Sequence, residues 1–206
     1  MRVATVLFAA MLVFASAGQS DVTAVFPALA PGVTLSGRFV QERHLRGLAA
    51  ALKTEGDFIV APGLGIIWRS EQPVSSVTVI TSQGIRRIVD GNEVQRFASA
   101  KVPAFAHLYD SLDLAIMGDW SALKNDFTVV CIGDRRAWRI VLTPKRSEGP
   151  PATRLAWIVL IGGGRIDTVD LMRASGDSDH VAFLNQVVTN AAPSGSDARL
   201  LNEKLE

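Results

Sequence analysis

The side chains that most often carry out catalysis or bind metals are few in this sequence. Three histidines occur, His44, His107 and His180, and none lies at a metal-ligand spacing from another histidine or from Cys131, the single cysteine. One cysteine excludes an intramolecular disulfide, and its β-branched surroundings favour a buried thiol. His107 and Asp110 are three residues apart on a predicted helix, a spacing that is common on solvated helix faces.

Motifs for covalent catalysis or phosphate binding are also missing. The sequence contains no G-x-S-x-G nucleophile elbow. The three glycines at 162–164 follow a predicted strand, but another strand follows them, so they indicate a hairpin turn rather than a phosphate loop. Glu42, Glu55 and Asp57 alternate with apolar residues, as the polar face of a strand does. We therefore expect no enzyme, no metal and no cofactor.

The first 17 residues predict a cleaved secretory signal peptide. Arg2 supplies the positive charge, residues 3–14 are apolar, and Ala15-Ser16-Ala17 is an A-x-A cleavage signal. The apolar run is shorter than the roughly 20 residues that span a bilayer. The remaining residues, 18–206, predict one exported domain. Removal of Arg2 leaves 20 of the 21 basic side chains against 20 acidic ones, a balance that argues against a nucleic-acid or anionic-membrane partner.

Alternating apolar residues predict a mainly β domain of about ten or eleven antiparallel strands. A sheet of this size curls or closes instead of staying flat. The segments FTVVCI and LAWIVLI are apolar on both faces, so we expect these strands to be covered on both sides. The expected strands are residues 33–45, 55–60, 65–69, 75–81, 85–89, 93–97, 127–133, 137–143, 154–161, 165–172 and 180–188.

One segment, Pro103–Met117, predicts a substantial helix that packs on the concave face or on one mouth of the sheet. Gly118 would end it, and Asp119 is a candidate cap for a second short helix. Residues 21–30 fit a short helix or a loose leader, and residues 199–206 a short helix or a frayed tail. The apolar stripe of the long helix contains Phe105, Leu108, Tyr109, Leu112, Ala115 and Ile116.

Large apolar side chains are numerous on the predicted strands. Ordinary core packing and the wall of a lipid cavity need the same residue types, so periodicity leaves both interpretations open. The residues concerned are Phe39, Phe58, Trp68, Trp138, Trp157 and Phe183.

Several short motifs occur in a fixed order and resemble those of the outer-membrane lipoprotein carrier (LolA-like) family. The N-terminal half contains Phe39-Val40-Gln41, Gly56-Asp57-Phe58, Pro62-Gly63, Trp68 and Pro73. The similarity continues into Asp119-Trp120, Leu142-Thr143-Pro144-Lys145 and Phe183-Leu184-Asn185. It covers most of the chain that follows the signal peptide.

The resemblance implies an unclosed β-barrel with a helical lid over a hydrophobic cavity. It also implies a monomeric, non-enzymatic periplasmic carrier that moves the acyl chains of lipoproteins from an inner-membrane exporter to an outer-membrane acceptor. Ala61 stands where the family usually has an arginine before the Pro-Gly turn, so an arginine latch on the lid is not expected. The variant pattern is similar to a divergent branch beside lipid or pigment biosynthesis genes, which makes other acylated cargo an open alternative.

Two further interpretations remain open at this stage. One is a protein-interaction module of an envelope lipid or pigment biosynthesis or export system, with a fully packed core. The other is a hydrolase or isomerase of a lipid intermediate, which would need His107 or His180 beside a carboxylate in a pocket. For the carrier, the candidate cavity and lid residues are Phe39, Gln41, Phe58, Trp68, Val77, Val79, Phe105, Leu108, Leu112, Trp138 and Trp157.

Overall fold

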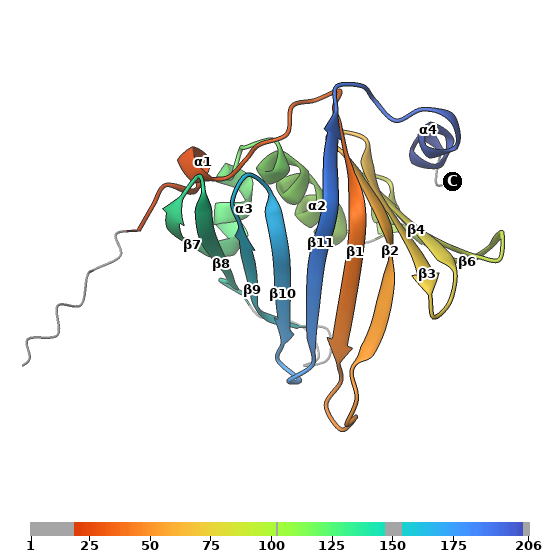
Figure 1. Cartoon of the computed structure of the whole chain (residues 1–206), viewed down its shortest axis with the longest axis horizontal. Helices are drawn as coiled ribbons and strands as arrows, with labels where there is room; N and C mark the ends of the chain where they lie inside the picture. The colour runs from red at the N-terminus through yellow and green to blue at the C-terminus, as the bar shows by residue number, and fades with distance from the viewer. Residues whose placement is uncertain (1–18, 102, 147–153, 204–206) are drawn as a thin grey trace, which may run out of the picture.

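A single antiparallel sheet of eleven strands dominates the structure, a computed structural model that describes residues 19–101, 103–146 and 154–203 (Figure 1). The predicted signal peptide, residues 1–17, lies outside these ranges. Each predicted strand is present, which confirms the mainly β fold. The strands are β1 (Thr34–His44), β2 (Leu52–Ala61), β3 (Gly65–Gln72), β4 (Ser76–Thr81), β5 (Gly84–Val89), β6 (Asn92–Ala98), β7 (Phe127–Asp134), β8 (Ala137–Pro144), β9 (Leu155–Gly162), β10 (Ile166–Arg173) and β11 (Ser178–Thr189).

The sheet consists of two meanders that meet at one seam. Its order is β6-β5-β4-β3-β2-β1-β11-β10-β9-β8-β7, so the first strand pairs with the last. At this seam Phe39 lies opposite Phe183, and a bulge between Ser36 and Arg38 shifts the register. The end strands β6 and β7 do not pair with each other in this order, so the sheet curls without closing.

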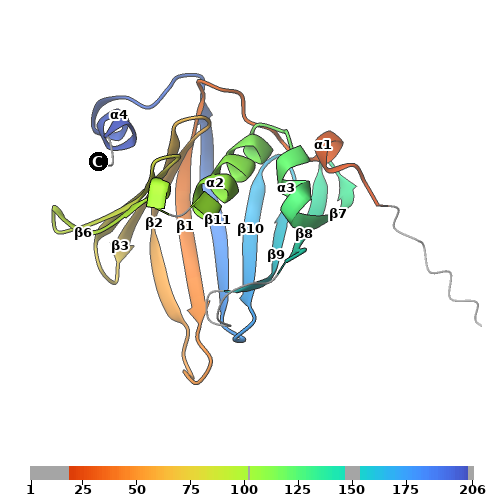
Figure 2. The ribbon, with the colours of Figure 1, turned by 180° about the vertical axis from the view of Figure 1, so that it is seen from behind.

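Three helices cover the concave face, which we call the inner face (Figure 2). They are α1 (Val22–Val25), α2 (Pro103–Ile116) and α3 (Ser121–Asp126); a short 3-10 helix, Ser99–Lys101, precedes α2. The predicted long helix is therefore confirmed. The core beneath these helices joins Trp120 and Leu123 to Trp138, Ile140 and Leu142 of β8, all nearly inaccessible to solvent.

A fourth helix, α4 (Gly195–Asn202), covers part of the opposite, outer face. Leu201 of α4 packs on Ile59, Ile67 and Val79, which come from β2, β3 and β4. The Arg86 side chain on β5 is buried next to this helix, where it reaches the carbonyl oxygen of Leu200 at 3.2 Å. The C-terminal segment is thus a packed helix and not a frayed tail.

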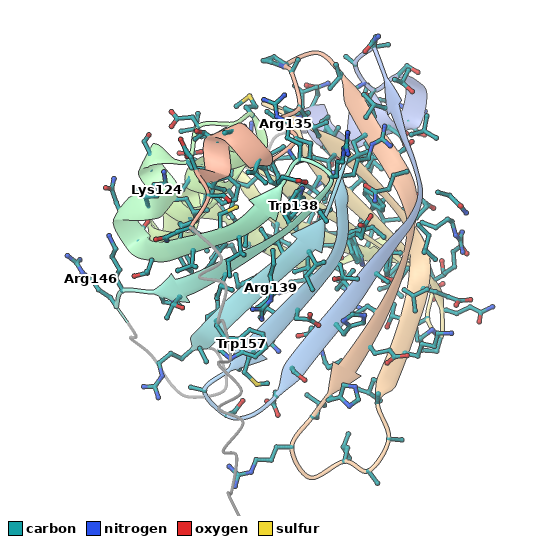
Figure 3. All side chains as sticks on the ribbon, turned by 60° about the vertical axis from the view of Figure 1, so that its left-hand side comes forward. Lys124, Arg135, Trp138, Arg139, Arg146 and Trp157 are labelled. Carbon is teal, nitrogen blue, oxygen red and sulfur yellow. The ribbon has the colours of Figure 1, made fainter. Side chains whose placement is uncertain are left out.

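The apolar segments FTVVCI and LAWIVLI belong to β7 and β9. No described helix covers the outer face of β9, which contradicts the expectation that this strand is covered on both sides (Figure 3). Strand alternation turns Ile158 and Leu160 to the inner core and Trp157 to the outer face. On this outer face Ile132 and Ile161 are 36% and 40% exposed.

A buried carboxylate ties three strands together at the lower part of the inner face. The Oδ1 atom of Asp179 on β11 accepts hydrogen bonds from Gln41 Nε2 (2.7 Å) and Arg43 Nε (2.6 Å) on β1. Its Oδ2 atom accepts from Arg173 Nη1 on β10 at 2.6 Å. Burial alone would raise the pKa of Asp179, but the hydrogen bonds from the two arginines and Gln41 outweigh it and hold this pKa below its ordinary value.

We predict that Asp179→Asn lowers the free energy of unfolding at about pH 7 by about 3 kcal/mol, because it breaks a buried charge pair at the seam. A carboxylate whose pKa falls on folding stabilises the folded state above its unfolded pKa, near 3.9, and loses this contribution as the pH falls through the folded pKa. The deficit of the variant should therefore shrink at about pH 3.5. Urea unfolding of the unsubstituted protein and of Asp179→Asn at the two pH values measures this difference in the free energy of unfolding.

Glu71→Gln is the control, since the Glu71–Arg38 pair is exposed on the outer face and should matter far less. An equal deficit of Asp179→Asn at both pH values would contradict the assigned role of the carboxylate.

Candidate functional site

The inner face contains an apolar cavity of about 300 Å³ at the upper end of the seam. We call it the strap cavity, because residues 26–33, the strap, form one of its walls. The other walls come from β1, β2, β11, the end of α2 and the β9–β10 turn. It is lined by Phe26, Pro27, Ala28, Leu29, Ala30, Val33, Leu35, Phe58, Val60, Ile116, Gly164, Arg165, Ile166, Phe183, Gln186 and Val188.

The strap crosses from the β7 edge to the start of β1 as extended chain. Pro27 and Pro31 interrupt this apolar segment, so neither a helix nor a paired strand continues through it. The Leu29 N–H group donates to the carbonyl oxygen of Ile116 at 2.9 Å and holds the strap to the end of α2. The Phe26 ring contacts the Trp120 ring edge to face, with centroids 5.1 Å apart. The strap is therefore anchored to the helices as well as to the sheet.

A cluster of four aromatic rings lies at the lower boundary of the cavity, and we call it the ring cluster. Phe39 and Trp68 stack with centroids 3.8 Å apart, and Phe58 meets Phe183 edge to face at 5.0 Å. Gly37 makes room for the Phe58 ring, because a Cβ atom at this position would lie 2.9 Å from ring atom Cε1. Phe58 and Phe183 line the strap cavity, whereas Phe39 is fully buried.

Polar groups are few in the strap cavity. Gln186 and Arg165 carry the polar side chains of its lining. The Gln186 amide donates to the carbonyl oxygen of Ile166 at 2.8 Å, and Arg165 Nη1 donates to the carbonyl oxygen of Gln186 at 3.4 Å. Both groups are engaged with backbone, so the cavity offers a hydrocarbon wall. Such a site suits an apolar chain rather than a reacting group.

The predicted site residues on the inner face occupy three different places. Phe58 lines the strap cavity, and Phe39 and Trp68 belong to the ring cluster. Trp68 and Gln41 line a second hollow below the ring cluster. Leu108 and Trp138 pack in the inner core, where Trp138 Nε1 donates to the carbonyl oxygen of Gly163 at 2.7 Å.

Three of the predicted residues lie on the outer face, so placing them at the cavity was wrong. Val77 and Val79 pack on the residues beneath α4, because strand alternation turns them away from Thr78, which faces the inner hollow. Trp157 lies on the uncovered outer face of β9, the same face as Arg139 (Figure 3). Leu112 of α2 is 39% exposed, and the side chain of Phe105 is outside the described part of the structure.

Much of the cavity wall was not among the predicted site residues. Leu35, Val60 and Val188 face the cavity on β1, β2 and β11. Strand alternation could have placed Leu35 with Phe39 and Val60 with Phe58, whereas the register shift between β1 and β11 is what brings Val188 to the same face as Phe183. The strap residues carried a weaker signal, an apolar segment interrupted by prolines. Its position at the cavity wall depends on the hydrogen bond from Leu29 to Ile116 of α2.

The histidines and the cysteine do not form a metal site within the described residues. His107 pairs with Asp126, and not with Asp110, at 2.9 Å in a shallow hollow of about 250 Å³. The residues lining this hollow include no serine, threonine or cysteine nucleophile. His180 pairs with Asp170 at 2.6 Å on the outer face, away from the strap cavity. Cys131 is buried, and burial raises the pKa of its thiol, so the thiolate is disfavoured.

A contact between α2 and the β2–β3 turn holds the lid where Ala61 leaves no arginine. Both carboxylate oxygens of Asp113 accept from the Gly63 N–H group at 3.1 Å. Gly63 has a φ of 78°, a left-handed conformation that favours glycine at this turn. An arginine at position 61 would place the charged group on the sheet. In this protein the charged group, Asp113, is on the helix, and the donor is the Gly63 N–H group of the β2–β3 turn.

An open sheet with helices on its inner face and an apolar cavity defines a binding-protein architecture. The sequence profile of the family described as outer membrane lipoprotein carrier protein LolA-like matches residues 14–200, and the chain belongs to this family. No curated protein matches the chain.

Among solved structures, a LolA superfamily protein from Nitrosomonas europaea is 8% identical, with a TM-score of 0.43, over 86% of this chain and 94% of that one. A putative outer membrane lipoprotein-sorting protein domain from Vibrio parahaemolyticus is 8% identical, with a TM-score of 0.39, over 84% and 91%. The complex of MucA and MucB from Pseudomonas aeruginosa is 17% identical, with a TM-score of 0.38, over 80% of this chain and 54% of that one. None of the described helices has the length and apolar character to cross a membrane.

We predict that Asp113→Ala increases amide hydrogen exchange at Gly63 about tenfold, because a hydrogen bond to a charged group contributes roughly 1.5–3 kcal/mol. Hydrogen-exchange mass spectrometry of the peptide that contains the β2–β3 turn measures this. Asp110→Ala is the matched control, since Asp110 is exposed on the same helix. Equal exchange in both variants would mean that Asp113 does not hold the lid.

Proposed function

We propose that this protein is a non-enzymatic periplasmic carrier that binds the acyl chains of lipoproteins, or of a related acylated cargo, in the strap cavity and moves them toward the outer membrane. The observation that carries the proposal is a cavity of about 300 Å³ with a nearly uniform hydrocarbon wall. Membership of the LolA-like family supports the same class of ligand.

The chemistry of the cavity suits reversible binding. Each buried methylene contributes about 0.8 kcal/mol, so about ten of them contribute roughly 8 kcal/mol before the entropic costs of association are subtracted. The engaged polar groups of Arg165 and Gln186 add little specificity for a chain end. Such a site holds acyl chains of several lengths and releases them when an acceptor competes.

Entry of a chain requires movement of a roof element, and the roof contacts are suited to this. The strap is tied to α2 by the backbone hydrogen bond from Leu29 to Ile116, and α2 is tied to the β2–β3 turn by Asp113. Neither contact is a buried ion pair, so opening does not strand a charge in an apolar environment. Inner-membrane and outer-membrane partner proteins would act on these elements.

The alternative, an interaction module with a fully packed core, is less well supported, because the space between the strap and the ring cluster is not filled by side chains. A hydrolase or isomerase is less well supported, because none of the described residues that line the hollow at His107 and Asp126 is a serine, threonine or cysteine. A carrier of acyl chains therefore remains the function that the cavity supports best.

Two adjacent residues of β11 provide a matched test. Val188 lines the strap cavity, whereas Val187 is 57% exposed on the outer face. We predict that Val188→Trp fills the cavity and weakens binding of a fluorescent fatty acid at least tenfold, while Val187→Trp leaves it within twofold. Fluorescence titration of delipidated protein measures both, with circular dichroism as the check on folding. Equal affinities for the two variants would place the acyl site elsewhere.

Purification of the protein from the periplasm of its own host provides an independent test. Native mass spectrometry followed by lipid extraction should find an acylated molecule bound. Consistently empty protein that also fails to bind the fluorescent fatty acid would refute the carrier function.

A further inference from the structure

A second hollow, of about 330 Å³, lies on the inner face directly below the ring cluster. We call it the basic hollow. Its walls come from β1 to β5, and strand pairing places its polar side chains on the same face as Phe39 and Trp68. The character of this hollow is opposite to that of the strap cavity. Hydroxyl groups of Ser70 and Thr78 and the amide of Gln41 replace the hydrocarbon wall.

Two arginines line the basic hollow, and no acidic residue does. Arg43 comes from β1 and Arg87 from β5, so they approach the hollow from opposite ends of its wall. The acidic side chains of the neighbouring strand positions belong to the other face, where Asp57 and Glu71 pair with Arg69 and Arg38. An anion in the hollow therefore meets positive charge, and the carboxylate next to the hollow, that of Asp179, is already bound by Gln41, Arg43 and Arg173.

The positive charge in this region exceeds what the protein itself neutralises. Asp179 accepts from both Arg43 and Arg173, so one carboxylate serves two guanidinium groups. Asp179 binds Arg43 through Nε, which leaves the two Nη nitrogens of this guanidinium directed elsewhere. Arg87 is exposed, and no ion pair joins it to another residue in the described ranges. Guanidinium groups with free nitrogens are well suited to phosphate and carboxylate.

The basic hollow and the strap cavity are separated by a single layer of rings. Trp68 lines the hollow, and its ring centroid lies 6.0 Å from that of Phe183 and 6.3 Å from that of Phe58, both of which line the strap cavity. A molecule with an apolar chain and an anionic end could thus place each part in matching surroundings. Tryptophan is the residue type that commonly marks such a boundary between apolar and polar environments.

We propose that the basic hollow binds the anionic head group, a phosphate or a carboxylate, of an amphiphile whose acyl chain occupies the strap cavity. This inference rests on the proposed function, because the acyl chain brings the head group to the hollow. Arg87 is the principal ligand of the anion, the hydroxyl groups of Ser70 and Thr78 donate to its remaining oxygens, and Arg43 adds positive charge from the opposite end of the wall. The preferred cargo is then an anionic acylated molecule rather than a neutral one.

The test compares two probes with the same chain, palmitoyl lysophosphatidate and uncharged monopalmitoylglycerol, on the mature protein, with inorganic phosphate alone as a third ligand. We expect the lysophosphatidate to bind about tenfold more tightly, and its advantage to decrease with added salt. Arg87→Gln should remove most of this advantage and leave the affinity for monopalmitoylglycerol unchanged. Arg139→Gln, an exposed arginine on the outer face with the same change of charge, should keep the advantage.

Each other result has a defined meaning. Equal binding of the two acyl probes to the unsubstituted protein, or an advantage that Arg87→Gln leaves intact, overturns the head-group site while acyl binding stands. Phosphate that binds as tightly as the lysophosphatidate overturns it as well, in favour of a free-anion site. Phosphate binding that depends on Arg87 without any acyl binding refutes the carrier function and, with it, the head-group role.

Discussion

The pairing of the first strand with the last is the interaction on which the rest of this structure depends. Each half of the sheet is a meander of neighbouring strands, and only the β1–β11 seam joins the halves into one curved surface. Backbone hydrogen bonds along the seam are supported by side chains of different chemistry at its two levels. The ring cluster, with Phe39 opposite Phe183, occupies the upper level, and Asp179 with its donors the lower. The strap cavity lies along this seam, and the basic hollow lies beside it, on the side of β1 to β5.

The elements of the fold could be predicted because the signals that define them are local. Alternating apolar residues, Pro-Gly and Asp-Gly turns and one helical stripe were enough to place eleven strands and the long helix. The assignment of faces was less reliable. Periodicity groups Val77 with Val79, but it does not say whether their shared face is the inner or the outer one. Helix α4 gives the outer face an apolar core of its own, so an apolar residue there resembles a cavity residue.

The candidate site was predicted only in part because its roof is made by non-local contacts. Phe58 carried both a family motif and strand alternation, whereas the strap carried neither. Its position depends on one backbone bond from Leu29 to the end of α2, nearly ninety residues further along the chain. The link between Asp113 and Gly63 is similar. Its acceptor is an ordinary helix carboxylate, and the Pro62-Gly63 turn signal marks the position of its donor but does not predict the partner.

The strand order also determines when the strap cavity can form. The strap cavity needs the strap, β1 and β2 from the beginning of the chain and β11 from its end. A growing chain that lacks β11 has neither Phe183 nor Val188, so the wall and the floor of the cavity are both incomplete. The cavity is thus completed in one step, when the last strand joins the first. An unfinished molecule therefore lacks the apolar cavity of the complete fold.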